Sequence, residues 1–267
     1  MPQAWEGIVD PPVRTRVNRK PRATGYTMVL DKGLGMYATA DLMQMARHVI
    51  DSLKLTFGTS AFYEESVLRE KIALVQDAGV DIYPGGTFLE AAVAQGKLPE
   101  YVLRAKELGF NTIEVSDGTI EMDAATRTDI IKRAKDAGFK VLTEVGKKDP
   151  KDAIATTTMH EQIASDLAQG ADKVIVEARE SGHGVGIFDA SGDVQSDMVQ
   201  EILGGINNVE DLIWEAPIKN QQQWLILEFG PNVNLGNIPP EDILALEALR
   251  CGMRGDTLKR ALAGTWP

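Results

Sequence analysis

The sequence predicts an α/β protein with the (β/α)8 TIM-barrel fold, built as a single domain behind a short N-terminal arm. Two observations lead to this prediction. Short apolar segments with strand character alternate eight times with segments of helical character, a pattern typical of a parallel sheet. The chain of 267 residues also has the length that eight such units need. We assign residues 1–24 to the arm and residues 25–267 to the barrel.

The turn after the first expected strand separates the barrel from the other common parallel fold. A doubly wound sheet that binds dinucleotides normally carries the pattern G-x-G-x-x-G at this point. Here the turn reads DKGLGMYA and lacks the third glycine. The sequence therefore favours the closed barrel.

The expected elements follow one another along the chain with short connections. The eight strands are expected within segments 25–35, 52–60, 80–87, 111–118, 139–148, 172–182, 211–217 and 224–230. The helices are expected at 39–51, 64–78, 99–108, 123–137, 161–169 and 195–203, with a helical turn at 219–222 and a last helix over 239–256. Four helix ends carry a glycine just before the next strand, namely Gly79, Gly109, Gly138 and Gly170. Glycine adopts the left-handed conformation that ends a helix, so the chain can turn back into the sheet at once.

Charge and composition exclude several classes of protein. A net charge of -11 argues against a nucleic-acid-binding surface, because such a surface needs a dense basic face. The sequence contains neither an apolar run of about 18 residues nor the apolar N-terminal segment of a signal peptide, so we expect no membrane partner and a cytoplasmic location. The single cysteine, Cys251, excludes an intramolecular disulfide and fits a reducing compartment.

The N-terminal arm is rich in proline and basic residues. Its cations are Arg14, Arg16, Arg19, Lys20 and Arg22. We expect the arm to pack on the outside of the barrel or on a neighbouring subunit, as chain termini commonly do. The alternative is that Arg22 lies near an anionic ligand.

Glutamates on three neighbouring strands are expected to point into the barrel. Side chains alternate along a strand, and apolar residues such as Ile113, Val115 and Val176 must face the helices. The residues turned inward by this alternation include the glutamates Glu114, Glu144 and Glu177, and also Lys54 and Glu215. Active sites of this fold lie at the C-terminal ends of the strands, where these residues stand.

Three converging carboxylates predict a metal site. Without enough cations they repel one another and destabilise the fold, and a hard divalent ion would neutralise them. Oxygen ligands of this kind suit Mg²⁺, so we expect Glu114, Glu144 and Glu177 to bind it. The alternative is a purely structural layer in which Lys54, Lys147 and Arg179 pair with these acids. The three histidines are too scattered to suggest zinc.

Two glycine-rich loops predict an anion site. ARESGHGVG follows the sixth expected strand and combines Arg179 and Ser181 with three glycines. After the last expected strand, FGPNVNLGNIPP offers Asn232, Asn234, Gly236 and Asn237 ahead of a helix. Exposed backbone N–H groups at a helix N-terminus bind phosphate, and this fold often carries phosphate after its last strands. The alternative is that these glycines only permit tight turns.

Several long motifs resemble those of one enzyme family. They are, in order, KPRATGYTMVLDKGLG, FGTS, YPGGTFLE, ELGFNTIEVSDGT, VLTEVGKK, VIVEARESG, WEAPIKNQQ and NVNLGNI, with RGDT near the end. This series, from Pro21 to Thr257, resembles the phosphosulfolactate synthases, which add sulfite to phosphoenolpyruvate on the way to coenzyme M and sulfolactate. A plant heat-stress-associated protein is related to them. The resemblance implies a lyase that is a Mg²⁺-dependent, homo-oligomeric TIM barrel.

The chemistry implied by the resemblance gives roles to further residues. Sulfite would attack the methylene carbon of phosphoenolpyruvate, charge would develop on its carboxylate, and a proton would then reach the carbon that carries phosphate. We expect Lys147 to donate this proton, with Lys148 as the alternate, because desolvation among cations would lower the pKa of a lysine toward neutrality. The anionic substrates would be bound by Lys32, Arg179 and the deeper Lys54, with Ser181, Asn234 and Gly236 lining the phosphate site.

Two other functions fit the same sequence. A Schiff-base aldolase acting on a phosphorylated keto-acid would use Lys54 or Lys147 as its nucleophile. A non-catalytic barrel, in the manner of the plant relatives, would leave its carboxylates without a metal ion.

Overall fold

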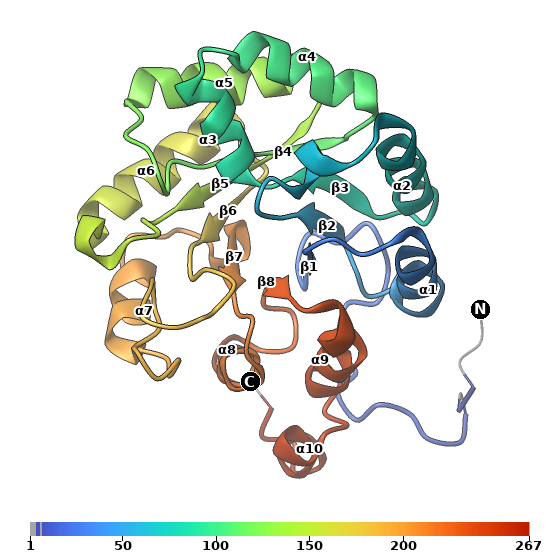
Figure 1. Cartoon of the computed structure of the whole chain (residues 1–267). Helices are drawn as coiled ribbons and strands as arrows, with labels where there is room; N and C mark the ends of the chain where they lie inside the picture. Colours follow the sequence, from blue (N-terminus) through green and yellow to red (C-terminus); the bar gives the residue numbers. More distant parts are fainter. Residues whose placement is uncertain (1–3, 6, 267) are drawn as a thin grey trace.

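The computed structural model describes residues 4–5 and 7–266 and shows eight parallel strands surrounded by helices (Figure 1). The strands are β1 (Thr27–Asp31), β2 (Ser52–Leu55), β3 (Asp81–Pro84), β4 (Thr112–Val115), β5 (Lys140–Val145), β6 (Lys173–Val176), β7 (Leu212–Glu215) and β8 (Leu235–Ile238). They pair in the order β3-β2-β1-β8-β7-β6-β5-β4. The (β/α)8 barrel predicted from the sequence is confirmed.

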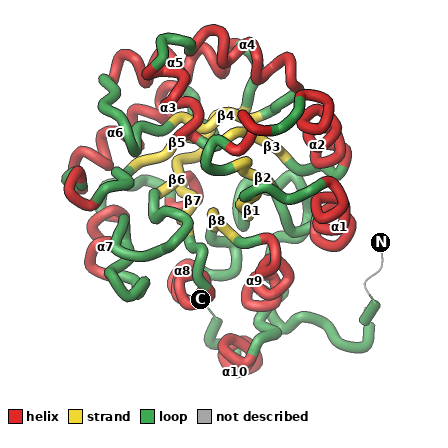
Figure 2. The backbone as a smooth tube through the Cα atoms, in the orientation of Figure 1, coloured by secondary structure: helices red, strands yellow, loops and turns green. Residues whose placement is uncertain are grey.

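The helices form the outer layer, as the colours of Figure 2 show. They are α1 (Met36–Ala46), α2 (Glu65–Asp77), α3 (Gly86–Ala94), α4 (Leu98–Leu108), α5 (Ala124–Asp136), α6 (Thr156–Gln169), α7 (Ser196–Leu203), α8 (Lys219–Phe229), α9 (Ile243–Arg250) and α10 (Gly255–Leu262). Short 3-10 turns lie at Thr59–Phe62, Pro150–Asp152, Val209–Asp211 and Pro240–Asp242. No helix in the described part of the chain is both long and apolar enough to cross a membrane.

The strand alternation divides the apolar residues into two layers. Outward residues such as Ile113, Val141 and Val174 are fully buried between the sheet and the helices. Five inward residues form a smaller apolar layer inside the barrel: Met28, Tyr83, Leu142, Ile175 and Ile213. This inner layer fills the middle of the barrel and lies below the charged residues at the C-terminal ends of the strands.

The fold differs from the prediction in three places, two of which lie in its last part. The apolar run 224–230 was expected to be the eighth strand, but it belongs to α8, and β8 is Leu235–Ile238. The expected helix over 239–256 is divided into a 3-10 turn, α9 and α10, and Gly252 lies at a left-handed φ of 73° between the two helices. Helix α3, which follows β3 directly, was not predicted.

The barrel has one seam that is not closed by strand pairing. Among the described residues, β3 and β4 share no register of backbone hydrogen bonds. Side chains bridge them instead: Asn111 Oδ1 accepts from Ile82 N at 3.0 Å, and Asn111 Nδ2 donates to Asp81 Oδ1 at 2.7 Å. At the upper end of the seam, Glu114 Oε1 accepts from Gly86 N at 2.7 Å.

From Val13 onward the arm packs against the end of the barrel where the strands begin, whereas residues 4–5 and 7–10 are exposed. Arg22 pairs with Asp51 just before β2, with Nη2 2.7 Å from Oδ2, and Arg16 pairs with Glu247 of α9 at 3.0 Å. The prediction that the arm packs on the barrel is therefore confirmed. The alternative that Arg22 lies near an anionic ligand is wrong, because its guanidinium is buried against Asp51 at the end opposite to the candidate site.

Candidate active site

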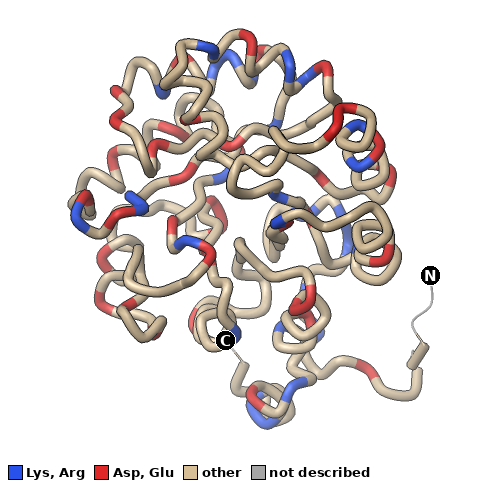
Figure 3. The backbone as a smooth tube through the Cα atoms, in the orientation of Figure 1, with Lys and Arg blue, Asp and Glu red and all other residues tan. Residues whose placement is uncertain are grey.

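A cavity of about 450 Å³ opens at the C-terminal ends of the strands. Its walls carry four glutamates from neighbouring strands, Glu114, Glu144, Glu177 and Glu215, together with the cations Lys54, Lys148 and Arg179. Charged positions of both signs occur on the inner strands as well as on the outer helices (Figure 3). The four glutamates are each at most 2 % exposed and Lys54 is 6 % exposed, so their charges depend on one another rather than on water.

Lys54 lies at the centre of this charged layer. Its Nζ is 2.9 Å from Glu114 Oε1, 3.4 Å from Glu215 Oε1 and 3.6 Å from Glu144 Oε2. Burial opposes the charge on Lys54, but these carboxylates outweigh it and raise the pKa of Lys54 well above its usual range. Lys54 is therefore a fixed cation that holds three strands together through their acids.

The structure separates the two neighbouring lysines that the sequence left as alternates. Lys148 Nζ lies between Glu144 Oε1 at 2.6 Å and Glu177 Oε2 at 2.7 Å, on the cavity wall. Lys147 Nζ instead donates to Asp117 O at 2.7 Å and to Ile120 O at 3.2 Å, outside that wall. Only Lys148 is therefore in a position to reach a ligand in the cavity.

The charge state of Lys148 differs from the expectation. A lowered lysine pKa was predicted, and burial does act in that direction, but Glu144 and Glu177 outweigh it and raise the pKa of Lys148. The predicted lowering is wrong because the lysine lies among carboxylates rather than among cations. Lys148 keeps its proton at neutral pH.

The glutamates do not titrate alike. Burial raises the pKa of Glu177 well above its usual range, and Glu144 and Glu215 add to the effect. Burial also opposes ionisation of Glu144, but Lys148 and Lys54 outweigh it and lower the pKa of Glu144. The pKa of Glu114 is raised by burial, with Lys54 acting in the opposite direction. Four carboxylates face two lysines at the centre, so fully ionised acids would outnumber these cations, and a divalent cation would stabilise the ionised forms that the raised pKa values of Glu177 and Glu114 disfavour.

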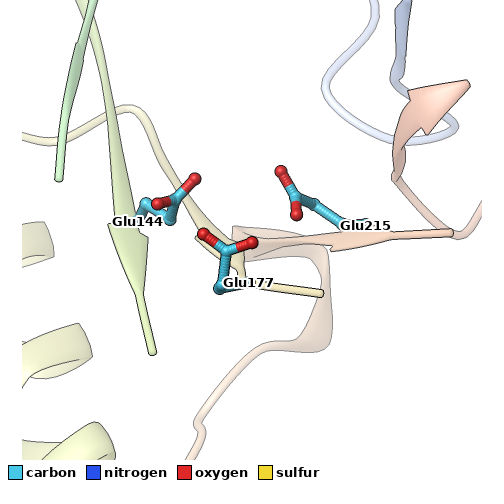
Figure 4. Close-up of side chains that lie close together, drawn as sticks. All are labelled: Glu144, Glu177 and Glu215. Carbon is cyan, nitrogen blue, oxygen red and sulfur yellow. The ribbon is translucent and has the colours of Figure 1, made fainter. Parts of the chain in front are cut away.

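The carboxylates that come closest together are Glu144, Glu177 and Glu215, with one oxygen from each within 4.8 Å of the others (Figure 4). The set predicted for the metal ion contained Glu114 in place of Glu215. Glu114 does point into the barrel, but its Oε1 is engaged by Lys54 and by Gly86 N–H at the seam, while its buried Oε2 has no hydrogen-bond partner. Strand alternation identified Glu215 as inward but gave it no role.

A buried glutamate that the sequence did not suggest supports the wall behind Lys148. Glu90 of α3 accepts hydrogen bonds from the backbone N–H groups of Gly118 at 3.2 Å and Thr119 at 2.8 Å, and from the hydroxyls of Ser116 and Thr119. Gly118 O in turn accepts from Lys148 N at 3.1 Å. The only signal in the sequence is a single acid within the apolar segment FLEAAVA.

The residues predicted to bind anions are dispersed over different parts of the fold. Arg179 lines the cavity, has a left-handed φ of 61° and donates its backbone N–H to Glu177 Oε1 at 2.5 Å. Ser181 is exposed, two residues further along the same loop. Lys32 is exposed, lies 5.8 Å from the centroid of the Phe57 ring, and lines a neighbouring cavity of about 350 Å³.

Two residues of the expected phosphate site lie elsewhere because β8 is not where it was predicted. Asn234 precedes β8, at the opposite end of the barrel, where its amide bonds Tyr26 N at 2.9 Å, Glu210 O at 2.7 Å and Leu212 O at 2.9 Å. Gly236 lies inside β8, where a Cβ atom would come within 2.7 Å of Met28 Cε. This glycine makes room in the barrel interior rather than in a loop.

Comparisons with known proteins agree with this architecture. The family model described as (2R)-phospho-3-sulfolactate synthase (ComA) matches residues 15–256. The phosphosulfolactate synthase of Methanothermobacter thermautotrophicus is 44% identical over 90% of this chain and 93% of its own length, and that of Bacillus subtilis is 40% identical over 92% and 96%. The plant Protein HEAT-STRESS-ASSOCIATED 32 of Arabidopsis thaliana is 24% identical over 86% of this chain and 87% of its own length.

Solved structures share the fold at low sequence identity. A 3-hexulose-6-phosphate synthase superposes with a TM-score of 0.56 at 14% identity, covering 84% of this chain and 98% of its own. A phosphonopyruvate hydrolase gives a TM-score of 0.55 at 13% identity, covering 91% and 84%. These likenesses concern the barrel alone. The family match and the 40–44% identity over most of the chain place this protein in the (2R)-phospho-3-sulfolactate synthase family of enzymes.

Proposed function

We propose that this enzyme adds sulfite to phosphoenolpyruvate to give 2-phospho-3-sulfolactate, with Mg²⁺ held by Glu144, Glu177 and Glu215. The observation that carries the proposal is the cluster of buried carboxylates around Lys148 at the mouth of the barrel. The relatives named phosphosulfolactate synthase support the same reaction.

The donor set fits a hard divalent cation. All three side chains offer carboxylate oxygens, and one oxygen of each lies within 4.8 Å of the others. To hold one Mg²⁺ ion, these carboxylates would exchange some of their present contacts with Lys148, Lys54 and Ala178 N–H for the cation. Glu114, the third predicted ligand, remains a candidate through its free Oε2 atom. When bound, the cation supplies positive charge close to the substrate carboxylate.

The residues of the chain perform the remaining tasks. Sulfite attacks the methylene carbon, a carbon–sulfur bond forms, and the electrons of the double bond move toward the carboxylate of the substrate. The ammonium of Lys148 carries a proton on the cavity wall and can give it to the carbon that bears phosphate. Arg179 and Lys54 add the positive charge that holds two anions in one cavity, and Lys32 stands at the neighbouring opening.

The Schiff-base alternative is disfavoured by the state of Lys54. A lysine nucleophile must lose its proton, and the carboxylates around Lys54 raise its pKa. We therefore expect treatment with borohydride and a phosphorylated keto-acid to leave the protein unmodified. A covalent adduct by mass spectrometry would support the aldolase instead.

The reaction can be followed by phosphorus NMR. Purified protein with phosphoenolpyruvate, sulfite and Mg²⁺ should give a new phosphate-ester signal that does not form with excess EDTA or without sulfite. A protein that leaves phosphoenolpyruvate unchanged under these conditions contradicts the proposal. A signal that still forms in excess EDTA contradicts only the proposed dependence on Mg²⁺.

The two adjacent lysines provide a matched test of the proton donor. Lys148→Met should lower kcat by roughly 100- to 10,000-fold, the range for loss of a general acid. Lys147→Met removes an ion pair with Asp117 and should lower the melting temperature while keeping most of kcat. If Lys147→Met caused the larger loss of kcat at full folding, Lys148 would not be the donor.

The assembly state stays a prediction. Phe62 and Leu103 are 87 % and 62 % exposed, and exposed apolar side chains often mark subunit contacts. We expect a homo-oligomer by light scattering of the purified protein.

A further inference from the structure

The pairing of β8 with β1 contains an irregularity at the cavity. Thr27 pairs with Leu235, but Val29 pairs with Ile238, so β8 advances by three residues where β1 advances by two. Asn237 lies within the extra step and has a left-handed φ of 56°. Bulges of this kind redirect a side chain and are frequent next to active sites.

The bulge places Asn237 on the cavity wall. Gly236 faces the barrel interior and Ile238 is fully buried in the outer core, so regular alternation has no inward position for Asn237. With the extra residue, Asn237 lines both the acidic cavity and the neighbouring cavity that contains Lys32. Its backbone N–H contacts Met28 Sδ at 3.3 Å, which holds the bulge against the inner apolar layer.

The Asn237 amide is buried without a partner. The residue is 3 % exposed, and Oδ1 has no hydrogen bond to any described residue. The neighbouring Glu215, by contrast, uses both oxygens, accepting from Ala178 N at 2.9 Å and pairing with Lys54 at 3.4 Å. A buried amide oxygen without a donor is costly, and a ligand that brings a donor removes that cost.

We propose that Asn237 is a specificity-determining residue whose amide binds an oxyanion carrying one proton. The amide oxygen accepts from the hydroxyl of the oxyanion, and the amide nitrogen donates to a neighbouring oxygen of the same group. The two candidate groups are the phosphate monoester and hydrogen sulfite, which share this donor–acceptor pattern. Their choice rests on the proposed function, which this proposal deepens. Sulfate has the same shape but cannot hold a proton near neutral pH, whereas a phosphate monoester, with a second pKa of about 6, and hydrogen sulfite can.

A purely conformational role for Asn237 makes a different prediction. Asparagine is enriched at left-handed φ values, so it could stand here only to form the bulge. Glycine adopts that conformation more easily. Asn237→Gly therefore removes the amide without straining the backbone, and under the conformational explanation it should bind ligands as the parent protein does.

The test measures binding of single oxyanions by calorimetry on the full chain, at constant ionic strength and with Mg²⁺ present. We expect the parent protein to bind phosphate, phosphoenolpyruvate or sulfite at least about tenfold more tightly than sulfate. Asn237→Gly should lose that preference, a change in affinity of about tenfold, as expected for one lost pair of hydrogen bonds. Its melting temperature without ligand should be unchanged or higher.

Asn237→Asp keeps an acceptor, loses the donor and adds a negative charge, so it should bind these oxyanions more weakly still. Asn208→Gly, at an exposed asparagine far from the cavity, is the matched control and should bind as the parent does. A selective loss of phosphate and phosphoenolpyruvate binding assigns the amide to the phosphoryl group, and a selective loss of sulfite binding assigns it to the nucleophile.

The inference is overturned if Asn237→Gly retains the preference, if the parent binds sulfate as tightly as phosphate and sulfite, or if the parent binds none of them. Failure of the proposed function gives a separate result. Selective oxyanion binding that depends on Asn237, without turnover of phosphoenolpyruvate and sulfite, would contradict the reaction and leave the role of Asn237 standing.

Discussion

Glu144 and Glu177 show how two identical side chains acquire opposite effects on stability. Glu144 is ionised between Lys148 and Lys54, which lower its pKa against the effect of burial. Glu177 has a raised pKa because burial and the carboxylates of Glu144 and Glu215 disfavour its charge. Lys148 contacts both acids, so the difference comes from Lys54, which pairs with Glu144 and not with Glu177.

The isosteric pair Glu144→Gln and Glu177→Gln tests this difference in metal-free protein at neutral pH. Glu144→Gln should lower the melting temperature, because two buried ammonium groups lose a counter-charge. Glu177→Gln should raise it by a few degrees, because a disfavoured charge is removed, and both should lose activity. Thermal unfolding in EDTA measures the first effect and the phosphorus NMR assay the second. Equal shifts of the two melting temperatures would contradict the assignment.

The pH dependence of stability follows from the same two pKa shifts. Between the unfolded glutamate pKa of about 4.3 and the raised pKa of Glu177, the folded state holds the extra proton, so stability falls as pH rises. The lowered pKa of Glu144 acts the other way: its stabilisation is present above about 4.3 and is lost as pH falls further. In the metal-free Glu177→Gln variant, the fall of stability with rising pH should be less steep. An unchanged slope in urea unfolding across this pH range would exclude Glu177 as its source.

At the scale of single elements, the sequence predicted the first seven strands and the inward direction of their polar residues. Period-two alternation is a strong signal in short strands whose outer face must be apolar, and it correctly turned Glu114, Glu144 and Glu215 inward. It could not choose which carboxylates converge, because that depends on the depth at which each strand ends. Glu177 lies one residue beyond β6, whereas Glu144 lies within β5.

The eighth strand was misassigned for a reason that lies in the sequence itself. The run WLILEF is short and apolar, and such runs fit a buried helix as well as a strand. In the structure Leu225 and Ile226 are buried on one side of α8, and Gln221 Oε1 accepts from Ile218 N at 3.2 Å at the start of the helix. The true β8, LGNI, contains a glycine and a bulge, so it carries little strand signal. The bulge at Asn237 was therefore beyond sequence reasoning.

Because β8 follows Asn234 directly, Asn234 is expected to stabilise the fold rather than to bind substrate. Asn234→Ala should cost about 2–4 kcal/mol of unfolding free energy, because three backbone groups, buried or partly buried, lose their partner. Activity of the folded protein should be retained, since the residue lies at the end of the barrel opposite to the cavity. Chemical denaturation and steady-state kinetics measure the two quantities, with the exposed Asn207→Ala as control. A large rise in KM at unchanged stability would restore Asn234 to the substrate site.

At the scale of the whole molecule, the protein is acidic, whereas both substrates that we propose for it are anions. The net charge is -11, and the central layer itself has more carboxylates than lysines. Long-range repulsion should therefore slow the approach of phosphoenolpyruvate and sulfite.

Raising the ionic strength from about 10 to 150 mM shortens the screening length from about 30 to 8 Å. We expect kcat/KM to rise over this range by a factor of roughly 2–10, at fixed Mg²⁺. Stopped assays at several concentrations of a monovalent salt would measure it. A fall of kcat/KM with salt would show that local cations, rather than the overall charge, govern approach to the site.

The seam between β3 and β4 has a consequence for the motions of the barrel. A cylinder joined there by the side chains of Asn111 and Glu114, rather than by a backbone ladder, has its weakest line at that place. Brief opening should occur along this line first, and the amide protons of Ile82 and Gly86 should exchange with heavy water earlier than those of the fully paired β1. Because the acceptor for Gly86 is a cavity carboxylate, its exchange rate would also report, from within the wall, whether the cavity is occupied.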